Sequence, residues 1–393
     1  MSLLLSRRGT SSYDLAPKPS WLALGTAVSR VVLFALISLL VMTTAAGSAA
    51  PDVLVVCPAA FRASLTPWEE YRRTQGHVLA LVEPHSAAEL RTAIRRAAKV
   101  GNLKFVVLIG DVPAVPTEYA AAKVNVRWGS EPTIATDQMY SDVDGDGVPD
   151  VAIGRIPADT PDELAAVVNK VLAYERNDDR GSSRRQINVV AGDGGFGPLT
   201  DALIEAAGRS VFKQVVPAEY QVCQLPAAPD ATCSQISAGS FAWIYLGHGL
   251  PTMLDRAQTP RGERPILATS DVPRLRCDMN RPLAVLVACY TGAIDARQDC
   301  LAEELAVHPR GPVAAIAATR VTMPYGNAVF GCELLRAIVA AGHPATLGEA
   351  WTRAQRQSLA ASTPEDSLRT SLDALAGGEV RSESSGEIGR AHV

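Results

Sequence analysis

The sequence lacks the net positive charge that a nucleic-acid-binding protein needs. It has 37 Lys and Arg residues against 41 Asp and Glu residues, which gives a formal net charge of −4 at pH 7. The arginine clusters are also short, since Arg7-Arg8 and Arg184-Arg185 are pairs. A basic field over one face of the protein is therefore not expected, and we predict that nucleic acid is not a partner.

The chain also has no CxxC pair and no Cys/His spacing typical of a zinc site. It has 7 cysteines, an odd number, so in an oxidising compartment at least one thiol stays unpaired within the chain. Six could pair and one remain free. A free or reactive thiol is therefore a better hypothesis than structural zinc.

The N-terminus has the order of a secretory signal peptide. Arginines and a lysine precede the apolar run VVLFALISLLVM (31–42), and the small-residue run TTAAGSAA follows it. We therefore interpret residues 1–50 as a signal peptide and expect a secreted, cell-surface or periplasmic protein. Because 31–50 has no charge and is about long enough to span a bilayer, an uncleaved anchor is the alternative. The membrane is a partner only in that case.

With 393 residues and 47% hydrophobic content, the chain can bury a large core or two moderate ones. Past residue 50, short apolar runs alternate with helical patterns. Strands are expected at DVLVVC, HVLALV, LKFVVLIGD and VAIGRI, and helices near 66–75, 86–99 and 161–174. A polar, Pro-rich segment (112–150) precedes VAIGRI. The βαβαβ order predicts a parallel sheet covered by helices on both faces.

A second alternation follows the polar connector RNDDRGSSRR (176–185). Buried strands are expected at INVVAG, SFAWIYLGHG, RPLAVLVACYTG and GPVAAIAATR, with a poorly defined strand around 214–224 and helices near 199–212, 327–341 and 346–360. The predicted fold is α/β, with two stacked subdomains (51–180 and 181–362) that each have a mostly parallel sheet flanked by helices.

Residues 363–393 are expected to form a polar tail. The last seven residues, EIGRAHV, are what one reading frame of a common sequencing adapter encodes. We therefore expect an artificially truncated end, with the genuine sequence breaking off after Gly386.

Two strands of the second alternation end in residues that can do chemistry. FAWIYLGHG brings His248 between two glycines, and LAVLVACYTG brings Cys289 just before a small-residue loop. Ligands of open parallel α/β sheets bind outside the carboxyl ends of the strands, and neighbouring strands lie about 4.8 Å apart. If these two strands are neighbours, the imidazole and the thiol face the same crevice.

A Cys/His pair suits acyl transfer, because the thiolate attacks a carbonyl carbon and the imidazole handles the protons. The N–H groups of Gly249 and Cys289 are the expected donors to the oxyanion. Taken singly, a cysteine that ends a buried strand is most often a small apolar filler, and a histidine in a glycine turn is often a capping group. The two together on adjacent strand ends favour catalysis.

The strand-GHG and strand-VAC elements follow the block TDQMYSDVDGDGVPDVAIGRIPADTPDELAAVVNKVLAYER. In this order, the three elements resemble the gingipain family of caspase-like cysteine peptidases, from about Lys104 to Arg320. The resemblance implies a caspase-like fold and a cysteine endopeptidase that acts on polypeptides. It implies Cys289 as the nucleophile and His248 as the catalytic base and acid, with no cofactor needed for the chemistry.

The resemblance also implies roles for two acidic residues. In the arginine-specific members, an acidic residue after the first strand of the catalytic unit supports the histidine, and INVVAGDGG places Asp193 there. A second acidic residue near the start of the next helix lies in their specificity pocket. Asp201 is the nearest counterpart here and would favour Arg or Lys at P1. The alternative for Asp201 is a helix N-terminal acid stabilised by the helix dipole.

The family also has calcium sites, and DVDGDGVPD (142–150) is a candidate for one. Its carboxylates alternate along the loop with Gly147 at the turn, as in the first half of an EF-hand loop. Position twelve would be Ile153 instead of Glu, so the loop is not an EF-hand. Clustered carboxylates repel one another without a cation, so we expect a structural calcium ion here and take a plain acidic turn as the alternative. The expected ligands are Asp142, Asp144, Asp146 and Asp150.

Two other functions compete with the peptidase. GDGGFG (192–197) matches the G-x-G-x-x-G pattern of a dinucleotide-binding oxidoreductase. However, Asp193 would put a negative charge inside the pyrophosphate loop, and no clear acidic residue follows about 20 residues on. The second rival is a catalytically inactive caspase-like surface or binding module, with Cys289 in a disulfide with Cys277 or Cys300.

Overall fold

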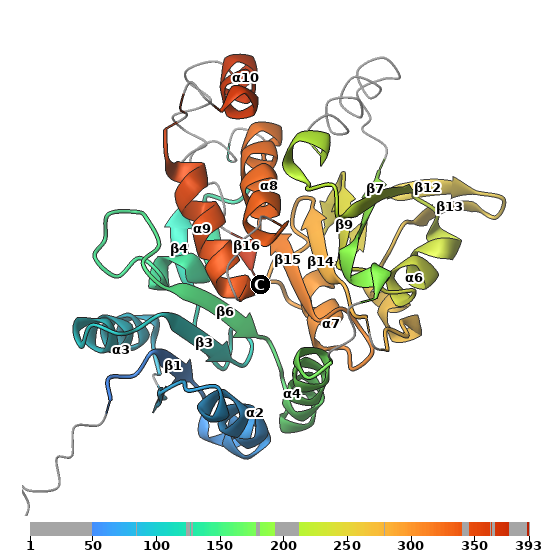
Figure 1. Ribbon diagram of the computed structural model, residues 1–393. Coiled ribbons are helices and arrows are strands. Elements are labelled where there is room, and N and C mark those ends of the chain that lie inside the picture. Colours follow the sequence, from blue (N-terminus) through green and yellow to red (C-terminus); the bar gives the residue numbers. More distant parts are fainter. Residues whose placement is uncertain are drawn as a thin grey trace, which may run out of the picture. The chain divides into compact units, whose positions relative to one another are not determined.

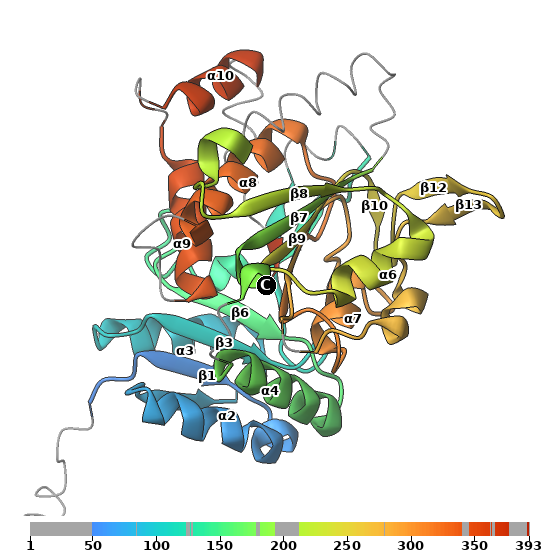
Figure 2. The ribbon, with the colours of Figure 1, turned by 45° about the vertical axis from the view of Figure 1, so that its right-hand side comes forward.

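Two mostly parallel β-sheets form the framework of the unit that begins at Ala50 (Figures 1 and 2). The computed structural model describes residues 49–83, 85–122, 126, 129–177, 181–192, 212–278, 280–339, 346–361, 363, 366–376 and 391–392. The expected signal segment (1–50), apart from its last two residues, lies outside these residues. Within them, no helix combines the length and the apolar character that crossing a bilayer would require.

The first sheet has four parallel strands in the order β2-β1-β3-β6. Its strands are β1 (Val53–Val56), β2 (Leu79–Val82), β3 (Phe105–Ile109) and β6 (Ala152–Ile156). Its helices are α2 (Arg62–Thr74), α3 (Ala87–Lys99) and α4 (Pro161–Glu175). These are the strands and helices expected from the apolar runs, with ends that differ by a few residues. The βαβαβ prediction is therefore confirmed.

Alternate residues of β1 face opposite layers, as the period of two along a strand requires. Val53 and Val55 pack in a cluster with side chains of α2 and α4. Leu54 and Val56 pack in another cluster, with side chains of α3. The sheet is therefore covered on both faces, which explains why its strands are apolar without alternation.

The start of α4 shows how the sequence defines a helix end. Thr160 is the N-cap residue, and its side chain accepts a hydrogen bond from the backbone N–H of Glu163 at 3.2 Å. The Glu163 carboxylate in turn accepts the backbone N–H of Thr160 at 3.3 Å. With Pro161 in the first helical position, this is a capping box.

The second sheet has six strands in the order β16-β15-β14-β9-β7-β8, all parallel except for β16 at the edge. The strands are β7 (Gln186–Ala191), β8 (Gln221–Leu225), β9 (Ala242–Leu246), β14 (Leu283–Val287), β15 (Ala314–Ala318) and β16 (Ala391–His392). The helices are α6 (Pro229–Ser237), α7 (Leu301–Val307), α8 (Pro324–Val339), α9 (Leu347–Leu359) and α10 (Ser367–Ala376).

Helices also cover this sheet on both faces. Trp243 and Tyr245 of β9 pack in a cluster that includes side chains of α6 and α7. Ile244, between them in the sequence, packs in a cluster with side chains of α8 and α9. The predicted fold class, an α/β protein with mostly parallel sheets flanked by helices, is therefore confirmed.

Several short elements were not expected from the sequence. The segment 112–150 contains a β-hairpin, and two more hairpins follow β9; one of these, β12-β13, projects at the right of Figures 1 and 2. The hairpins are β4-β5 (Glu118–Ala121, Thr133–Thr136), β10-β11 (Gly249–Leu250, Met253–Leu254) and β12-β13 (Arg256–Thr259, Gly262–Pro265). In the part of the chain that the structure describes, 3₁₀ helices also form at η1 (Ala59–Phe61), η3 (Asp137–Tyr140), η4 (Ser182–Arg185) and η5 (Thr269–Arg274).

The structure corrects two further expectations. The strand expected around 214–224 begins only at Gln221, because residues 212–215 are helical. The expected polar tail from 363 contains α10, which contacts α8. Tyr325 of α8 donates its hydroxyl proton to the buried carboxylate of Asp373 at 2.7 Å. The tail therefore contributes to the packing of the second sheet. Most of the helix expected at 199–212 lies outside the described residues.

Candidate active site

The two strands that end in His248 and Cys289 are neighbours in the second sheet. β9 and β14 pair in parallel, with Leu246 opposite Val287. The pairing continues by one residue, since the backbone N–H of Gly247 donates to the carbonyl oxygen of Val287 at 3.2 Å. His248 follows Leu246 by the same number of residues as Cys289 follows Val287, so the two residues lie at the same end of the paired strands. The condition on which the sequence argument depended is therefore met.

The glycine after His248 lets the two strand ends approach closely. A Cβ atom at Gly249 would lie 2.9 Å from the carbonyl oxygen of Cys289 and 2.6 Å from Cγ2 of Thr291, so no larger residue fits there without a shift. The backbone at His248 is also held, because its carbonyl oxygen accepts hydrogen bonds from the Tyr245 hydroxyl and from the N–H of Asp255, each at 3.1 Å. The His248 side chain is exposed on this fixed backbone.

Cys289 lies at a sharp turn out of β14. Tyr290, the next residue, has a φ of 61°, and among the described residues it is the one non-glycine residue with positive φ. The N–H of Tyr290 donates to the carbonyl oxygen of Arg320 at 3.2 Å, so the turn is bonded to the segment that follows β15. Such a turn ends the strand at once, and Cys289 is half-buried there.

All seven cysteines lie among the described residues, and each has a free thiol. Cys277 and Cys300 are fully buried in the cluster that covers one face of the second sheet. Burial raises the pKa of Cys277 to about 11. The structure therefore does not contain the disulfide that the binding-module alternative invoked for Cys289.

One polar residue contacts the sulfur of Cys289 and was not identified from the sequence. The backbone N–H of Thr322 donates to Cys289 Sγ at 3.4 Å, and Oγ1 of Thr322 lies 3.7 Å from the same sulfur. Sγ also lies 4.0 Å from the carbonyl oxygen of Thr322, which can accept the thiol proton. Thr322 is 33 positions further along the chain, and no motif marks it.

A charged network fixes the loop that follows Cys289. Arg320 donates to both carboxylate oxygens of Asp295, at 2.8 and 2.6 Å, and its Nε donates to the carbonyl oxygen of Thr133 at 3.0 Å. Burial alone would raise the pKa of Asp295, but the hydrogen bond and charge of Arg320 outweigh it and hold the pKa below its ordinary value. Tyr290 adds a hydrogen bond from its hydroxyl to Glu131 at 3.0 Å.

Two of the expected site residues, Asp193 and Asp201, lie outside the described residues. The same holds for GDGGFG beyond Gly192. The roles of Asp193 and Asp201, and of the Gly249 and Cys289 N–H groups as oxyanion donors, stay predictions.

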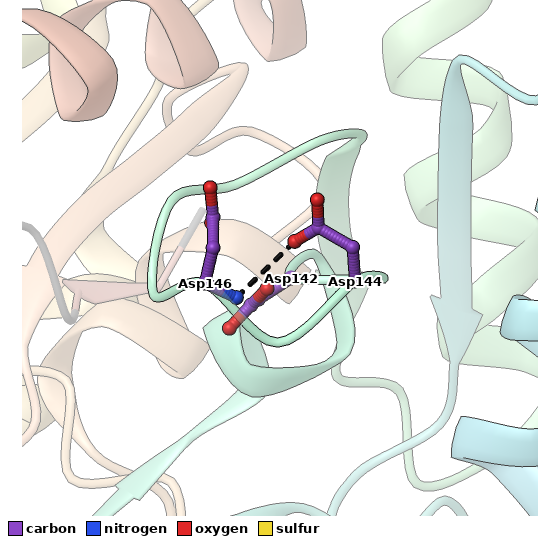
Figure 3. A group of neighbouring side chains, drawn as sticks. All are labelled: Asp142, Asp144 and Asp146. Atoms are coloured by element: carbon purple, nitrogen blue, oxygen red, sulfur yellow. Dashed lines mark hydrogen bonds between the residues drawn. The ribbon is translucent and has the colours of Figure 1, made fainter.

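The acidic loop brings together three of the four expected calcium ligands (Figure 3). Asp142, Asp144 and Asp146 each offer a carboxylate oxygen, and these atoms lie within 4.8 Å of one another. Asp150 does not join this group. Its carboxylate instead accepts the backbone N–H groups of Val143 and Asp144 at 2.8 and 3.3 Å, which closes the loop. Converging carboxylate oxygens are the donor set that calcium prefers, so these residues fit the ion.

The described fold resembles solved gingipain structures. The crystal structure of the Arg specific cysteine proteinase gingipain R (RGPB) matches with a TM-score of 0.67 and 16% sequence identity. The match covers 87% of this chain and 77% of the gingipain R chain. In the complex of Porphyromonas gingivalis RgpB pro- and mature domains, the TM-score is 0.65 with 18% identity, and the match covers 86% of this chain and 76% of that chain. The protein is thus an α/β protein of the gingipain fold.

Sequence comparison defines the family. The sequence model of peptidase family C25 matches residues 47–374, and the chain belongs to this family. Lys-gingipain of Porphyromonas gingivalis is 25% identical over 272 residues, and the match covers 64% of this chain and 14% of the relative's length. Gingipain R2 of the same organism is 25% identical over 259 residues, covering 63% of this chain and 32% of the relative. The predicted gingipain resemblance is confirmed, and the chain spans a minor part of these relatives.

Proposed function

We propose that the chain is an exported cysteine endopeptidase that hydrolyses polypeptides, with Cys289 as the nucleophile and His248 as the general base and acid. The observation that supports this most directly is the parallel pairing of β9 with β14, which puts the two residues at the same end of neighbouring strands. Membership in peptidase family C25 supports the same activity.

The proposed reaction has two steps. The Cys289 thiolate attacks the carbonyl carbon of the scissile peptide, and the backbone N–H groups of Gly249 and Cys289 stabilise the oxyanion. His248 takes up the thiol proton and gives it to the leaving amine as the C–N bond breaks. In the second step, His248 takes a proton from water, the hydroxide attacks the thioester, and the thiolate leaves as the carboxylic acid forms.

We further propose a preference for Arg or Lys at P1. The names of the relatives support this, because one is a Lys-gingipain and another is an Arg specific proteinase. In this proposal Asp201 contributes negative charge to the pocket and Asp193 supports His248. A peptide library with all residues at P1 measures the preference directly.

Calcium is proposed as a structural ion, bound by Asp142, Asp144 and Asp146 in the loop between η3 and β6. When bound, the ion supplies positive charge that offsets the repulsion among the three carboxylates. The chemistry of the peptidase needs no further cofactor in this proposal.

The proposed function is tested by thiol labelling together with peptide hydrolysis. Iodoacetamide should alkylate Cys289 at a single site in the native protein, and the alkylated protein should lose its activity. Cys289→Ala should abolish hydrolysis without a loss of stability, because the half-buried thiol contributes little packing. His248→Ala should lower both hydrolysis and the rate of labelling.

Cys223→Ala is the matched control, since Cys223 is also half-buried but lies on the edge strand β8. This variant should keep full activity and the labelling of Cys289. A Cys289→Ala protein that still hydrolyses peptides would contradict the proposal. Wild-type protein that cleaves no peptide of the library would favour the binding module instead.

A further inference from the structure

We propose that Thr322 is a further catalytic residue, whose backbone N–H and side-chain hydroxyl together bind the thiolate of Cys289. The inference rests on the proposed function, because it assigns a role in the same reaction to a residue that contacts the reacting sulfur. It goes beyond that function because neither the histidine nor the oxyanion donors account for the contacts of Thr322.

The contacts around the sulfur favour its anionic form. The backbone N–H of Thr322 donates to Sγ of Cys289 at a donor–acceptor distance of 3.4 Å. This contact needs the sulfur as an acceptor, so it persists when the thiol has lost its own proton. Oγ1 lies at 3.7 Å and can donate a second proton. The third contact, to the carbonyl oxygen of Thr322 at 4.0 Å, serves only the protonated thiol and is the longest. Donors to a charged acceptor stabilise the charged form.

Asn327 satisfies the Thr322 hydroxyl as an acceptor and leaves its proton for another partner. The Asn327 side-chain amide donates to Oγ1 of Thr322 at 2.8 Å. A hydroxyl has one proton to donate and accepts through its lone pairs. With a lone pair occupied by Asn327, the proton of Oγ1 is available to the sulfur. Asn327 is therefore a positioning residue, which acts through Thr322.

The backbone that carries Thr322 is fixed from both sides. Two residues before it, Arg320 is 7% exposed and is bonded to Asp295 and to the carbonyl oxygen of Thr133. Two residues after it, α8 begins at Pro324, and the N–H of Asn327 donates to the carbonyl oxygen of Met323 at 3.0 Å. The sulfur thus lies beside the N-terminus of a 16-residue helix, where the helix dipole also favours an anion.

Titratable groups on the segments next to Cys289 must stay the same in the experiment. They are His248 at the end of β9, Tyr290 and Asp295 after β14, Arg320 after β15 and Glu131 before β5. None of these groups is altered by a change at position 322. A comparison of Thr322 variants therefore isolates the contribution of its hydroxyl.

The test measures the rate at which iodoacetamide alkylates Cys289 between pH 5 and 9, with peptide mapping to identify the alkylated residue. The value of kcat/KM is measured over the same pH range. Thr322→Val removes the hydroxyl and keeps the shape, whereas Thr322→Ser keeps the hydroxyl. We expect Thr322→Val to lower the alkylation rate at pH 6 by about tenfold, the size of one weak hydrogen bond to a charged group. The two rates should approach each other as the pH rises, because a rising pH ionises the thiol of either protein. Thr322→Ser should follow the wild-type profile.

Asn327→Leu provides a second variant that leaves Thr322 in place. It should move the acid side of the alkylation profile in the same direction as Thr322→Val, by a smaller factor. Thr92→Val, at an exposed position of α3, which packs on the first sheet, is the control and should leave the profile unchanged. A merely structural role of Thr322 would lower the melting temperature and the rate at every pH, without moving the profile along the pH axis.

The outcomes separate this inference from the proposed function. If Thr322→Val and Asn327→Leu both alkylate with the wild-type profile, the inference is overturned, whatever the peptidase activity. If Thr322→Val shifts the profile and lowers kcat/KM at pH 6, both proposals are supported. If the profile shifts but the wild-type protein cleaves no peptide, Thr322 binds the thiolate and the endopeptidase proposal fails.

Discussion

At the scale of single residues, the ion pair between Asp137 and Arg155 explains part of the sequence block that resembles the gingipains. Nε and Nη2 of Arg155 donate to the two carboxylate oxygens of Asp137, each at 2.8 Å. Nη1 donates to the carbonyl oxygens of Gly110 and Val115, also at 2.8 Å. Both side chains are buried. The pair therefore joins β6, η3 and the loop after β3, and its role is structural.

Removal of one partner from this pair should be costly. In Arg155→Met, the carboxylate of Asp137 stays buried without its counter-charge, so we expect a loss of about 3–5 kcal/mol in the free energy of unfolding. Urea unfolding, followed by circular dichroism, measures it. The double variant Arg155→Met/Asp137→Leu should recover much of the loss, because no buried charge remains.

Arg62→Met is the control for the buried pair, since Arg62 forms an exposed ion pair with Glu83 and its side chain is 47% exposed. It should change the stability by about 0–1 kcal/mol. Equal losses in Arg62→Met and Arg155→Met would show that burial does not determine the energy of the Arg155 pair.

Sequence analysis could identify those candidate site residues whose position is determined by the strand that they end. His248 and Cys289 end apolar runs, so the direction of the strands already places them at one edge of the sheet. Thr322 could not be nominated, because its contact with the sulfur depends on the conformation of two loops. Asp150 shows the same limit, since the spacing of the aspartates does not reveal which carboxylate closes the loop.

At the scale of elements, the sequence predicted the central strands and missed the hairpins for a physical reason. β9 and β14 are buried on both faces and read as AWIYL and LAVLV, so burial alone marks them as strands. β12 and β13 read as RAQT and GERP. Their pairing depends on the turn and on backbone hydrogen bonds, which leave no periodic apolar signal.

The acidic loop makes a prediction at this scale. If calcium occupies it, addition of calcium should raise the melting temperature of the wild-type protein, and EDTA should lower it, because the ion binds the folded state alone. Asp142→Asn should remove most of this response, since both oxygens of Asp142 face the loop, where they accept the N–H groups of Gly145 and Gly147 at 2.8 and 3.0 Å.

Differential scanning calorimetry with and without calcium measures the response of each variant. Asp162→Asn is the control, because Asp162 is an exposed acid in the first turn of α4, outside the loop. A wild-type protein whose melting temperature is the same in calcium and in EDTA would contradict the proposed ion.

At the scale of the whole molecule, hydrogen bonds join the loop after the candidate nucleophile to a distant segment of the chain. The loop after Cys289 follows a strand of the second sheet, but Arg320 and Tyr290 bond to Thr133 and Glu131 of the β4-β5 hairpin, which lies in the chain between β3 and β6 of the first sheet. A second contact joins α9 to the acidic loop before β6, where Arg356 donates to the carbonyl oxygen of Pro149 at 2.7 Å. Such contacts between distant segments have no signature in a single sequence, so sequence analysis predicted two subdomains without their connections.

Lys170 makes another of these connections, and it should make the stability depend on pH. The side chain is 3% exposed in α4, and its ammonium donates to the carbonyl oxygens of Ala306 and His308 at the end of α7. Burial, with a smaller contribution from the charge of Arg281, lowers the pKa of Lys170 from 10.5 to about 7. Two other titratable groups lie beside it. Cys277 has a pKa raised to about 11 and stays protonated between pH 7 and 9. Burial, with a contribution from the charge of Lys170, lowers the pKa of His308, so this imidazole stays neutral over the same range.

The sign of the effect follows from proton binding. Between pH 7 and pH 10.5 the unfolded chain keeps the proton on Lys170, whereas the folded protein has released it. Unfolding then takes up a proton, so the free energy of unfolding rises with pH, by at most about 1.4 kcal/mol per pH unit. Below pH 7 both states are protonated and this contribution is flat. Relative to Lys170→Met, the wild-type protein should therefore gain about 2–3 kcal/mol between pH 7 and pH 9.

Urea unfolding of both proteins at pH 6, 7, 8 and 9 gives the difference directly, and other titrating groups cancel because the two proteins share them. Lys99→Met, at the exposed C-terminal end of α3, should show no such trend. A difference between wild type and Lys170→Met that stays constant from pH 7 to pH 9 would mean that the buried ammonium keeps its proton. In that case the two carbonyl oxygens at the end of α7 compensate for burial, and a charged ammonium donates to them at all these pH values.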